Sequence, residues 1–261
     1  MTEPLVSCLM VTKNRARFAR RALHCLASQT WGNKELVIID DGDEDYEPVL
    51  AEYRHLFPIQ YHKLTPDPAV RLGQLRNLSL ERARGDFLIQ WDDDEWYHPE
   101  RIATQMAAAA SGLDVVVLQN TLCHLDTPGY AEHLFHTNIP RGTTPGTVLH
   151  RRSNVRYPNL GRAEDTVYLK ELAATVRFGV LEEPHSHLFI RCFHGANTWD
   201  LRHFEGALQH SFSQKVWYRI CKHVFRDLKR HPAFRLTELE QRAAAQFLED
   251  SRLLGLLPRS A

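Results

Sequence analysis

Short apolar runs rich in β-branched residues alternate with amphipathic stretches through the first half of the chain. The apolar runs predict strands over residues 5–11, 35–39, 59–62, 87–91 and 114–118. The stretches between them predict helices over residues 16–28, 46–56, 72–84 and 99–110. This alternation is typical of βα units, so we predict an α/β fold with a mainly parallel central sheet and helices on both of its faces.

The second half of the chain is less regular. Residues 120–158 are rich in Gly, Pro, Thr and His, which predicts loops with a short strand at 147–151. A helix is predicted over 163–173, a pair of strands over 175–181 and 187–192, and two terminal helices over 204–230 and 236–254. We therefore expect one domain over 1–203, with halves 1–118 and 119–203, and a C-terminal helical extension over 204–261.

Composition narrows the possible partners of the chain. The 261 residues are 43% hydrophobic, and 32 Lys and Arg balance 32 Asp and Glu. Such a chain buries a full core and has no overall field that attracts nucleic acid, so no nucleic-acid partner is expected. The five cysteines lie far apart without a C-x-x-C pair, which favours reduced core residues over disulfides or a zinc site.

The first residues and the length of the apolar segments bear on where in the cell the protein is expected to lie. An acid and a proline precede the first apolar run, unlike a signal peptide, and no segment approaches the roughly 20 apolar residues that span a bilayer. The sequence predicts a cytoplasmic chain. Residues 215–230 mix bulky apolar and basic side chains, and this pattern fits either peripheral contact with the inner face of a membrane or a helix whose apolar stripe packs on the domain over 1–203.

The loop after the first strand has no glycine, because Thr12 is followed by Lys13, Asn14 and Arg15. The P-loop and the dinucleotide fingerprint are both absent from it. A bound diphosphate would therefore need a metal ion or basic side chains to neutralise its charge.

Four consecutive carboxylates, residues 92–95, follow the strand at 87–91. Ligands bind at this end of parallel strands, and in an extended segment Asp92 and Asp94 face the same way. Two oxygen ligands suit Mg²⁺ or Mn²⁺, although an acidic loop can also be merely solvated. Asp40, Asp41 and Gly42 end the second strand in the same manner, where a carboxylate can accept hydrogen bonds from a base or a ribose, or the segment can be a simple turn.

The order of several short motifs resembles family 2 of the inverting glycosyltransferases. These motifs are Pro4-Leu5-Val6-Ser7, Thr12-Lys13-Asn14-Arg15, Gln29-Thr30, Glu35-Leu36-Val37-Ile38-Ile39-Asp40-Asp41-Gly42, Arg76-Asn77 and Trp91-Asp92-Asp93-Asp94-Glu95. The likeness continues at Ala163-Glu164-Asp165. The resemblance implies a GT-A type, Rossmann-like fold and a nucleotide-sugar donor.

The resemblance also implies roles for individual residues. The implied donor-site residues are Thr12, Asn14, Arg15, Asp40, Asp41, Arg71, Arg76, Asp92 and Asp93, of which Asp40 would meet the base and Arg71 or Arg76 would border the base or the phosphates. Asp92 and Asp94 stand where the family has its D-x-D signature, with a divalent cation as cofactor. Asp93 in the middle and Glu95 after it depart from the usual pattern, so which carboxylate holds the metal is open.

Two further sites are implied downstream. Glu164 and Asp165 resemble the catalytic pair, with Asp165 as general base for an acceptor hydroxyl. An acidic first turn of a helix is the plain structural alternative, and a helix N-terminus lowers the basicity of a carboxylate. His194 stands where several metal-dependent GT-A enzymes have a histidine that completes the metal site or meets the diphosphate.

Together these features predict an inverting, metal-assisted glycosyltransferase that moves a sugar from a UDP-sugar to a hydroxyl of a glycan or glycolipid. Two alternatives stay open. One is a non-catalytic module that binds nucleotide sugars. The other is a sugar nucleotidyltransferase, which would normally need a glycine-rich, basic loop after the first strand, and that loop is missing here.

Overall fold

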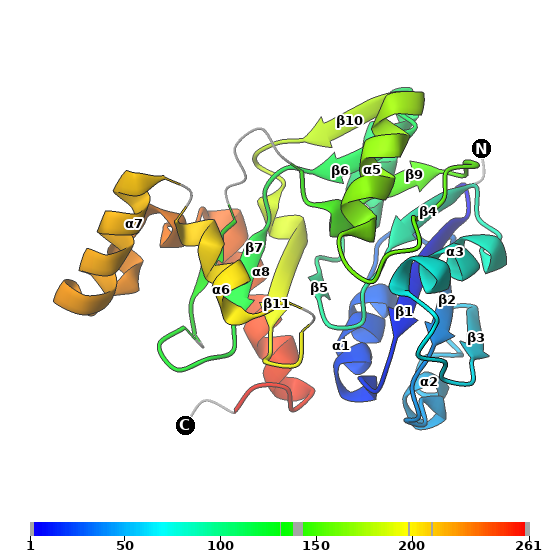
Figure 1. Cartoon of the computed structure of the whole chain (residues 1–261), viewed down its shortest axis with the longest axis horizontal. Coiled ribbons are helices and arrows are strands. Elements are labelled where there is room, and N and C mark those ends of the chain that lie inside the picture. Colours follow the sequence, from blue (N-terminus) through cyan, green and yellow to red (C-terminus); the bar gives the residue numbers. More distant parts are fainter. Residues whose placement is uncertain (1–2, 131, 138–142, 198, 210, 259–261) are drawn as a thin grey trace. The chain divides into compact units, whose positions relative to one another are not determined.

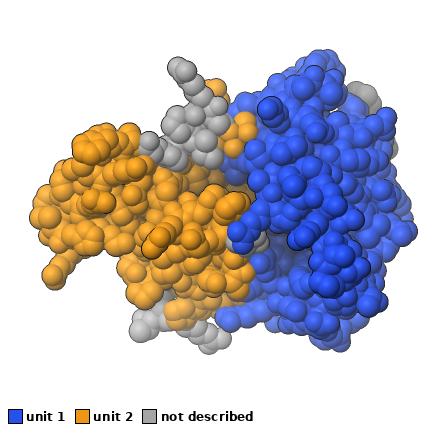
Figure 2. Space-filling model, viewed as in Figure 1, with its two compact units in different colours: residues 1–118, 144–181 blue, residues 119–143, 182–261 orange. Residues whose placement is uncertain are grey.

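The computed structural model describes residues 3–130, 132–137, 143–197, 199–209 and 211–258. The chain packs into two compact units, each made of two segments of sequence (Figure 2). Unit 1 comprises residues 1–118 and 144–181, and unit 2 comprises residues 119–143 and 182–261. These units are defined by packing, and the functional division into 1–203 and 204–261 stays a prediction.

Seven of the described strands form the central sheet of unit 1 (Figure 1). Across the sheet they are β10 (Phe178–Leu181), β6 (Val115–Leu118), β9 (Leu149–Arg151), β4 (Phe87–Gln90), β1 (Val6–Thr12), β2 (Lys34–Asp40) and β3 (Ile59–Lys63). The strands pair in parallel, except that β9 runs antiparallel between β4 and β6. The five strands predicted in the first half are thereby confirmed, and so is the mainly parallel sheet.

The helices of unit 1 cover this sheet. They are α1 (Ala16–Ala27), α2 (Glu47–Ala51), α3 (Leu72–Arg82), α4 (Arg101–Ala110) and α5 (Glu164–Thr175), with a short strand β5 (Trp96–Tyr97) before α4. On one face Leu75 of α3 and Leu172 of α5 join Leu9 and Val37 in a buried cluster. The alternate strand residues, such as Met10, are also fully buried, as expected for a parallel sheet covered on both faces.

Unit 2 has its own strands and core. Its elements are β7 (Leu122–Leu125), β8 (Leu134–His136), β11 (Phe189–Phe193), α6 (Leu201–Glu205), α7 (Phe212–Arg219) and α8 (Glu238–Leu253). β7 pairs in parallel with β11 and antiparallel with β8. Aromatic residues dominate the core, where Phe135, Phe204 and Phe234 pack together with Tyr218. Within the described residues, no helix is both long enough and apolar enough to cross a bilayer.

Three of the sequence-based predictions need correction. The strands predicted at 175–181 and 187–192 do not pair, because β10 joins β6 in unit 1 whereas β11 joins β7 in unit 2. The helix predicted over 46–56 is shortened to α2. The long helix predicted over 204–230 is broken into α6, α7 and short turns, since Ser211 caps a new helix at α7 and Arg226 adopts a left-handed conformation with φ 51°.

The remaining elements agree with the patterns. α5 and α8 occupy the ranges predicted at 163–173 and 236–254, with shifts of one to two residues at their ends. All five cysteines are free and buried, which confirms the expectation that they are reduced core residues.

Candidate functional site

The carboxyl ends of β1 and β4 bring a first group of polar side chains together. Thr12 ends β1, and its hydroxyl donates a hydrogen bond to Oδ2 of buried Asp93. Because that hydroxyl has a single proton, the contact between Thr12 Oγ1 and the Tyr46 hydroxyl is one in which Tyr46 donates. The Tyr46 oxygen accepts in turn from the backbone N–H of Arg15 at 2.8 Å. Loops after two neighbouring strands are thus joined by one hydrogen-bonded chain.

Arg15 faces the acidic loop that follows β4. Its Nη1 lies 3.0 Å from Asp94 Oδ2 and 3.5 Å from Asp93 Oδ1. Burial opposes the charge of Arg15, yet the carboxylates of Asp94 and Asp93 outweigh it and raise the pKa of Arg15. Burial and the adjacent charge of Asp94 raise the pKa of Asp93 to about 7. Two buried acids thus lie side by side with Arg15 and Arg21 next to them, and Arg21 Nη2 donates to the Asp94 carbonyl oxygen at 2.6 Å.

The acidic loop turns at Asp93 and Asp94 and does not continue as an extended strand. Asp93 and Asp94 consequently share Arg15, whereas Asp92 contacts Arg76, so simple alternation of side chains does not describe this loop. The carboxylate oxygens of this loop nevertheless suit a divalent cation as ligands. Hard carboxylate oxygens are the ligands that Mg²⁺ and Mn²⁺ prefer.

Arg76 of α3 connects this loop to the start of α5. Its Nε donates to Glu164 Oε1 at 2.9 Å, and its two Nη atoms donate to Asp92 Oδ1 at 3.3 Å. Burial opposes the charge of Arg76, and the neighbouring Asp92 raises its pKa above the ordinary value. Burial raises the pKa of Glu164, against the lowering effect of Arg76. One guanidinium therefore fixes two carboxylates that belong to different predicted roles.

The first turn of α5 presents its two acids differently. Ala163 precedes the helix in a left-handed conformation with φ 59°, which is uncommon for a residue with a Cβ. Glu164 is buried against Arg76. Asp165 is partly exposed, and its Oδ1 accepts a hydrogen bond from the Thr166 N–H at 2.7 Å. Of the pair, Asp165 is the more exposed.

A second polar group lies at the carboxyl ends of β2 and β3. Asp40 is fully buried, and its Oδ1 accepts from the Gly42 N–H at 2.8 Å. Its Oδ2 accepts from the Tyr61 hydroxyl at 2.7 Å and from Lys63 Nζ at 2.8 Å. A carboxylate offers about four acceptor positions, so three are taken. By this count one acceptor position remains, on Oδ1, and contact of Asp40 with a base stays a prediction.

Asn14 and Asp41 connect the loops that follow β1 and β2. Asn14 has φ 54°, and its Oδ1 accepts from the N–H groups of Asp43 at 2.7 Å and Glu44 at 3.0 Å. Gly42 passes so close that a Cβ there would lie 2.6 Å from the Asn14 nitrogen. Asp41 Oδ2 accepts from Lys13 Nζ at 3.1 Å. Asn14 thus ties the loop after β2 to the loop after β1.

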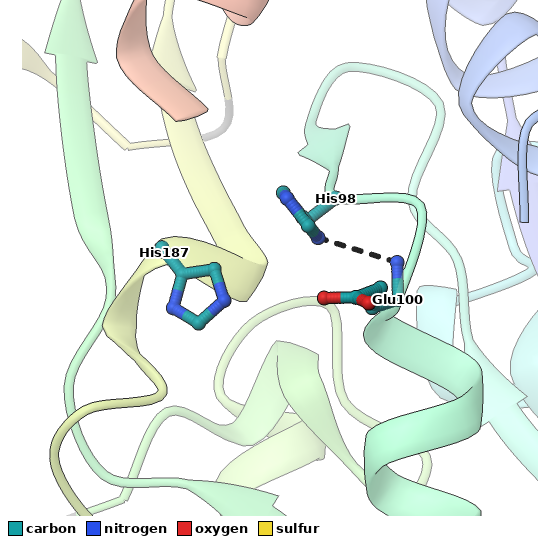
Figure 3. A group of neighbouring side chains, drawn as sticks. All are labelled: His98, Glu100 and His187. Carbon is teal, nitrogen blue, oxygen red and sulfur yellow. Dashed lines mark hydrogen bonds between the residues drawn. The ribbon is translucent and has the colours of Figure 1, made fainter. Parts of the chain in front are cut away.

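Stacked aromatic rings and a buried arginine pack against the acidic loop. The Trp91 and Tyr97 rings stack with centroids 3.9 Å apart, and the Tyr97 hydroxyl donates to the Asp92 carbonyl at 2.9 Å. The buried Arg101 places its Cζ 4.7 Å from the Tyr97 centroid. His98 Nδ1 accepts from the Glu100 N–H at 3.2 Å, just before α4 (Figure 3). This packing fixes the backbone from which the aspartates project.

Two further candidate residues are Arg71 of unit 1 and His194 of unit 2. Arg71 is exposed just before α3, where its N–H donates to Gln74 Oε1 at 2.9 Å. His194 follows β11 in unit 2, where its N–H donates to Asn197 Oδ1 at 2.8 Å and its Nδ1 accepts from the Ala196 N–H at 3.4 Å. Their roles at a donor or metal site stay predictions.

Sequence reasoning missed several residues of the site. Tyr61 and Lys63 end β3, and polar side chains at the carboxyl end of a strand were a usable signal for them. Tyr46 gave no comparable signal, because its hydroxyl reaches Thr12 from the start of α2 only after the chain has folded. Gln90 Nε2, which donates to Asp92 Oδ2 at 2.8 Å, was equally hidden.

The mainly parallel sheet with one antiparallel strand, and acidic side chains at its carboxyl edge, define a GT-A type α/β protein. The model of the family described as glycosyl transferase family 2 matches residues 7–166, which is more than half of the chain. The chain therefore belongs to glycosyl transferase family 2.

Relatives among curated proteins include two from Bacillus subtilis (strain 168). The putative glycosyltransferase EpsH is 32% identical over 117 residues, covering 45% of this chain and 34% of EpsH. Protein CgeD is 34% identical over 163 residues, covering 57% of this chain and 38% of CgeD. The matched region thus spans less than two fifths of the length of either relative.

Solved structures share the fold at low sequence identity. S. aureus TarS 1–349 in complex with UDP-GlcNAc matches with a TM-score of 0.60 and 17% identity, covering 95% of this chain and 72% of that one. The mannosyltransferase PcManGT from Pyrobaculum calidifontis, in complex with GDP-Man and Mn²⁺, matches with a TM-score of 0.55 and 14% identity, covering 99% and 78%.

Proposed function

We propose that this chain is an inverting glycosyltransferase that moves a sugar from a nucleotide sugar to a hydroxyl of a glycan or glycolipid acceptor. The observation that carries the proposal is the bridge formed by Arg76, which holds Asp92 of the acidic loop and Glu164 of the catalytic pair in one ion-paired group. A donor-binding carboxylate and the start of the base-bearing helix are thereby held together. Such mutual positioning is what a displacement reaction requires.

The donor we propose is a UDP-sugar, with Mg²⁺ or Mn²⁺ as cofactor. Asp92 and Asp94 would hold the cation with Asp93 beside them, and His194 is a further candidate ligand. The cation would offset negative charge on the diphosphate. TarS in complex with UDP-GlcNAc supports the uridine donor, and PcManGT with GDP-Man and Mn²⁺ supports the cation while keeping guanosine donors open to test.

Asp165 acts as the general base in this proposal. It takes the proton from the acceptor hydroxyl as that oxygen forms a bond to the anomeric carbon, while the bond from this carbon to the diphosphate oxygen breaks and the diphosphate leaves with its electron pair. Attack opposite the leaving group inverts the configuration. Glu164 is buried against Arg76, so its task is to position the loop, and the partly exposed Asp165 is left to meet the acceptor.

The acceptor hydroxyl is proposed only as a class. A glycan and a lipid-linked glycan both offer such a hydroxyl, and the matched part of the relatives leaves more than half of their length outside the comparison.

The donor site is tested by thermal shift with UDP, GDP, CMP and TDP, each with and without Mn²⁺. We expect one nucleotide, UDP, to stabilise the wild type in the presence of Mn²⁺, and by about 2.7 kcal/mol at a concentration of roughly 100 times its Kd. Asp94→Ala should lose the Mn²⁺-dependent part. Absence of any shift in the wild type would remove the basis of the donor site.

Turnover is tested separately from binding. Asp165→Asn should keep the nucleotide-dependent thermal shift and lose sugar transfer, because the amide cannot accept the acceptor proton. Glu171→Gln, an exposed acid farther along α5, is the matched control and should retain transfer. Wild-type binding with no transfer to any glycan or glycolipid hydroxyl would favour the non-catalytic module.

A further inference from the structure

The helix that begins with α7 has a buried and an exposed apolar side. A π-helical turn, Ile220–Phe225, continues α7 without a break, so the helical segment runs from Phe212 to Phe225. Tyr218 and Cys221 point into the core of unit 2. Phe212 and Val224 instead leave 83% and 70% of their surface exposed. Packing within the described chain therefore accounts for one side of the helix only.

Three exposed apolar residues, Phe212, Val216 and Val224, form a row together with the half-buried Ile220. Phe212, Val216, Ile220 and Val224 follow one another at intervals of four, the spacing of neighbours on one helix face. Such a row drifts around an α-helix, because one turn has 3.6 residues, and the wider π-helical turn reduces this drift. We call these four residues the apolar row. Beside it Trp217 and Phe225 are also exposed, with their rings 6.0 Å apart.

Basic side chains run alongside the apolar row. Lys215 and Arg219 share its spacing one position earlier, and both are exposed. Arg226 and Lys229 continue the exposed basic positions beyond the helix, and Arg230 places its Cζ 4.4 Å from the Phe225 centroid. The chain as a whole is neutral, yet residues 206–237 contain seven Lys or Arg and one acid, Asp227. Two of these cations are paired, Lys222 with Glu205 at 3.2 Å and Arg230 with Asp227 at 3.4 Å. The positive charge is thus concentrated where the apolar surface is exposed.

We propose that the apolar row and its basic neighbours lie against the surface of an anionic lipid bilayer. Helices that bind in the interface of a membrane bury an apolar face while Lys and Arg reach the lipid phosphates with their long side chains. The cores of protein interfaces, in contrast, are depleted of lysine, whereas Lys215 and Lys229 are exposed here. This contact is separate from glycosyl transfer, since it uses none of the residues of the candidate site.

The test is flotation of the full chain with vesicles of phosphatidylcholine alone and of phosphatidylcholine mixed with phosphatidylglycerol. The wild type should float with the anionic vesicles and stay in solution with the neutral ones. Phe212→Ser combined with Val224→Ser should weaken binding to anionic vesicles about 100-fold, because two apolar side chains no longer enter the membrane interface. Lys215→Glu with Arg219→Glu should weaken it about 10-fold or more.

Matched controls lie on α8, outside this surface. Leu253, which is 73% exposed, gives the apolar control Leu253→Ser, and the exposed Arg242 gives the charge control Arg242→Glu. Both should bind vesicles as the wild type does. All four substitutions in the helical segment from Phe212 to Phe225 replace exposed side chains, so far-ultraviolet circular dichroism and the nucleotide-dependent thermal shift should be unchanged.

Two results would overturn the proposal. One is equal flotation of the wild type and of the Phe212 and Val224 double variant with anionic vesicles. The other is absence of wild-type flotation with anionic vesicles. If the sedimentation mass then also falls when these two residues are changed, the surface belongs to a contact with a second copy of this chain. Loss of transfer with vesicle binding intact would count against the proposed function and leave the membrane surface standing.

Discussion

Removing the guanidinium of Arg76 should reveal how strongly the candidate site depends on one buried cation. Arg76→Met keeps most of the side-chain volume but leaves Glu164 and Asp92 without the group that neutralises them. The Arg76 side chain is 11% exposed, and that of Glu164 is 3% exposed, so water replaces little of the lost interaction. Breaking a buried ion pair from one side costs about 3–5 kcal/mol.

We take the lower end of that range, because the Asp92 side chain is 22% exposed and water can partly solvate it. A loss of about 3 kcal/mol corresponds to a fall in Tm of roughly 6–12 °C for a chain of this size. Without Arg76 the pKa of Glu164, already raised by burial, should rise further, so part of the loss is avoided by protonation of Glu164.

The assay is urea unfolding of the wild type, Arg76→Met, Glu164→Gln and the double variant. Glu164→Gln alone should also destabilise, since it leaves Arg76 with one carboxylate partner fewer. The double variant should be more stable than the sum of the two single losses predicts, because no buried charge is left unpaired at Glu164. Strict additivity, or an unchanged stability of Arg76→Met, would refute the reasoning.

Two other predictions concern the framework. Gly73→Ala should lower Tm or displace the start of α3, because its new Cβ would overlap the Pro158 carbonyl oxygen, and thermal unfolding measures the loss. In unit 2, His136 and Glu240 form a pair whose pKa values move apart. Burial lowers the pKa of His136, but Glu240, with Glu183 nearby, raises it more, so the pKa of His136 is raised. Burial raises the pKa of Glu240, but hydrogen bonds from His136, Ser186 and Thr237 lower it more, to about 2. The stability from the His136–Glu240 pair should therefore be complete between about pH 4.3 and 6.5. It should be lost as pH rises through the raised pKa of His136 or falls through about 2, so urea unfolding should show the difference between wild type and His136→Gln shrinking above neutral pH.

Much of unit 1 followed from local pattern alone. The runs that became β1, β2 and β4 contain consecutive apolar residues at 8–11, 36–39 and 87–89, which marks strands buried on both faces of a parallel sheet. Polar residues directly after such runs must lie at the carboxyl edge, and this rule located Thr12, Asp40 and the acidic loop. These features depend on neighbours in sequence, so periodicity was sufficient to find them.

The contacts that make the candidate site depend on distant residues. Arg76 meets Asp92 across 16 positions and Glu164 across 88, and Tyr46 reaches Thr12 across 34. No local pattern encodes these meetings, because each forms only when α3, α5 and α2 are packed on the sheet. The turn that lets Asp93 and Asp94 share Arg15 likewise depends on the support given by Tyr97.

By itself, then, the sequence determined the α/β class, the positions of the main strands and the acids at their ends, since these follow from the periodic placement of apolar side chains. Tertiary structure alone decided that β9 enters the sheet antiparallel and that β10 and β11 belong to different units. It also decided which side of the helix from Phe212 to Phe225 stays exposed. The reason is physical. Strand partners and exposed faces are fixed by burial summed over the whole chain, whereas the pattern of a few neighbouring residues is enough to indicate a helix or a strand.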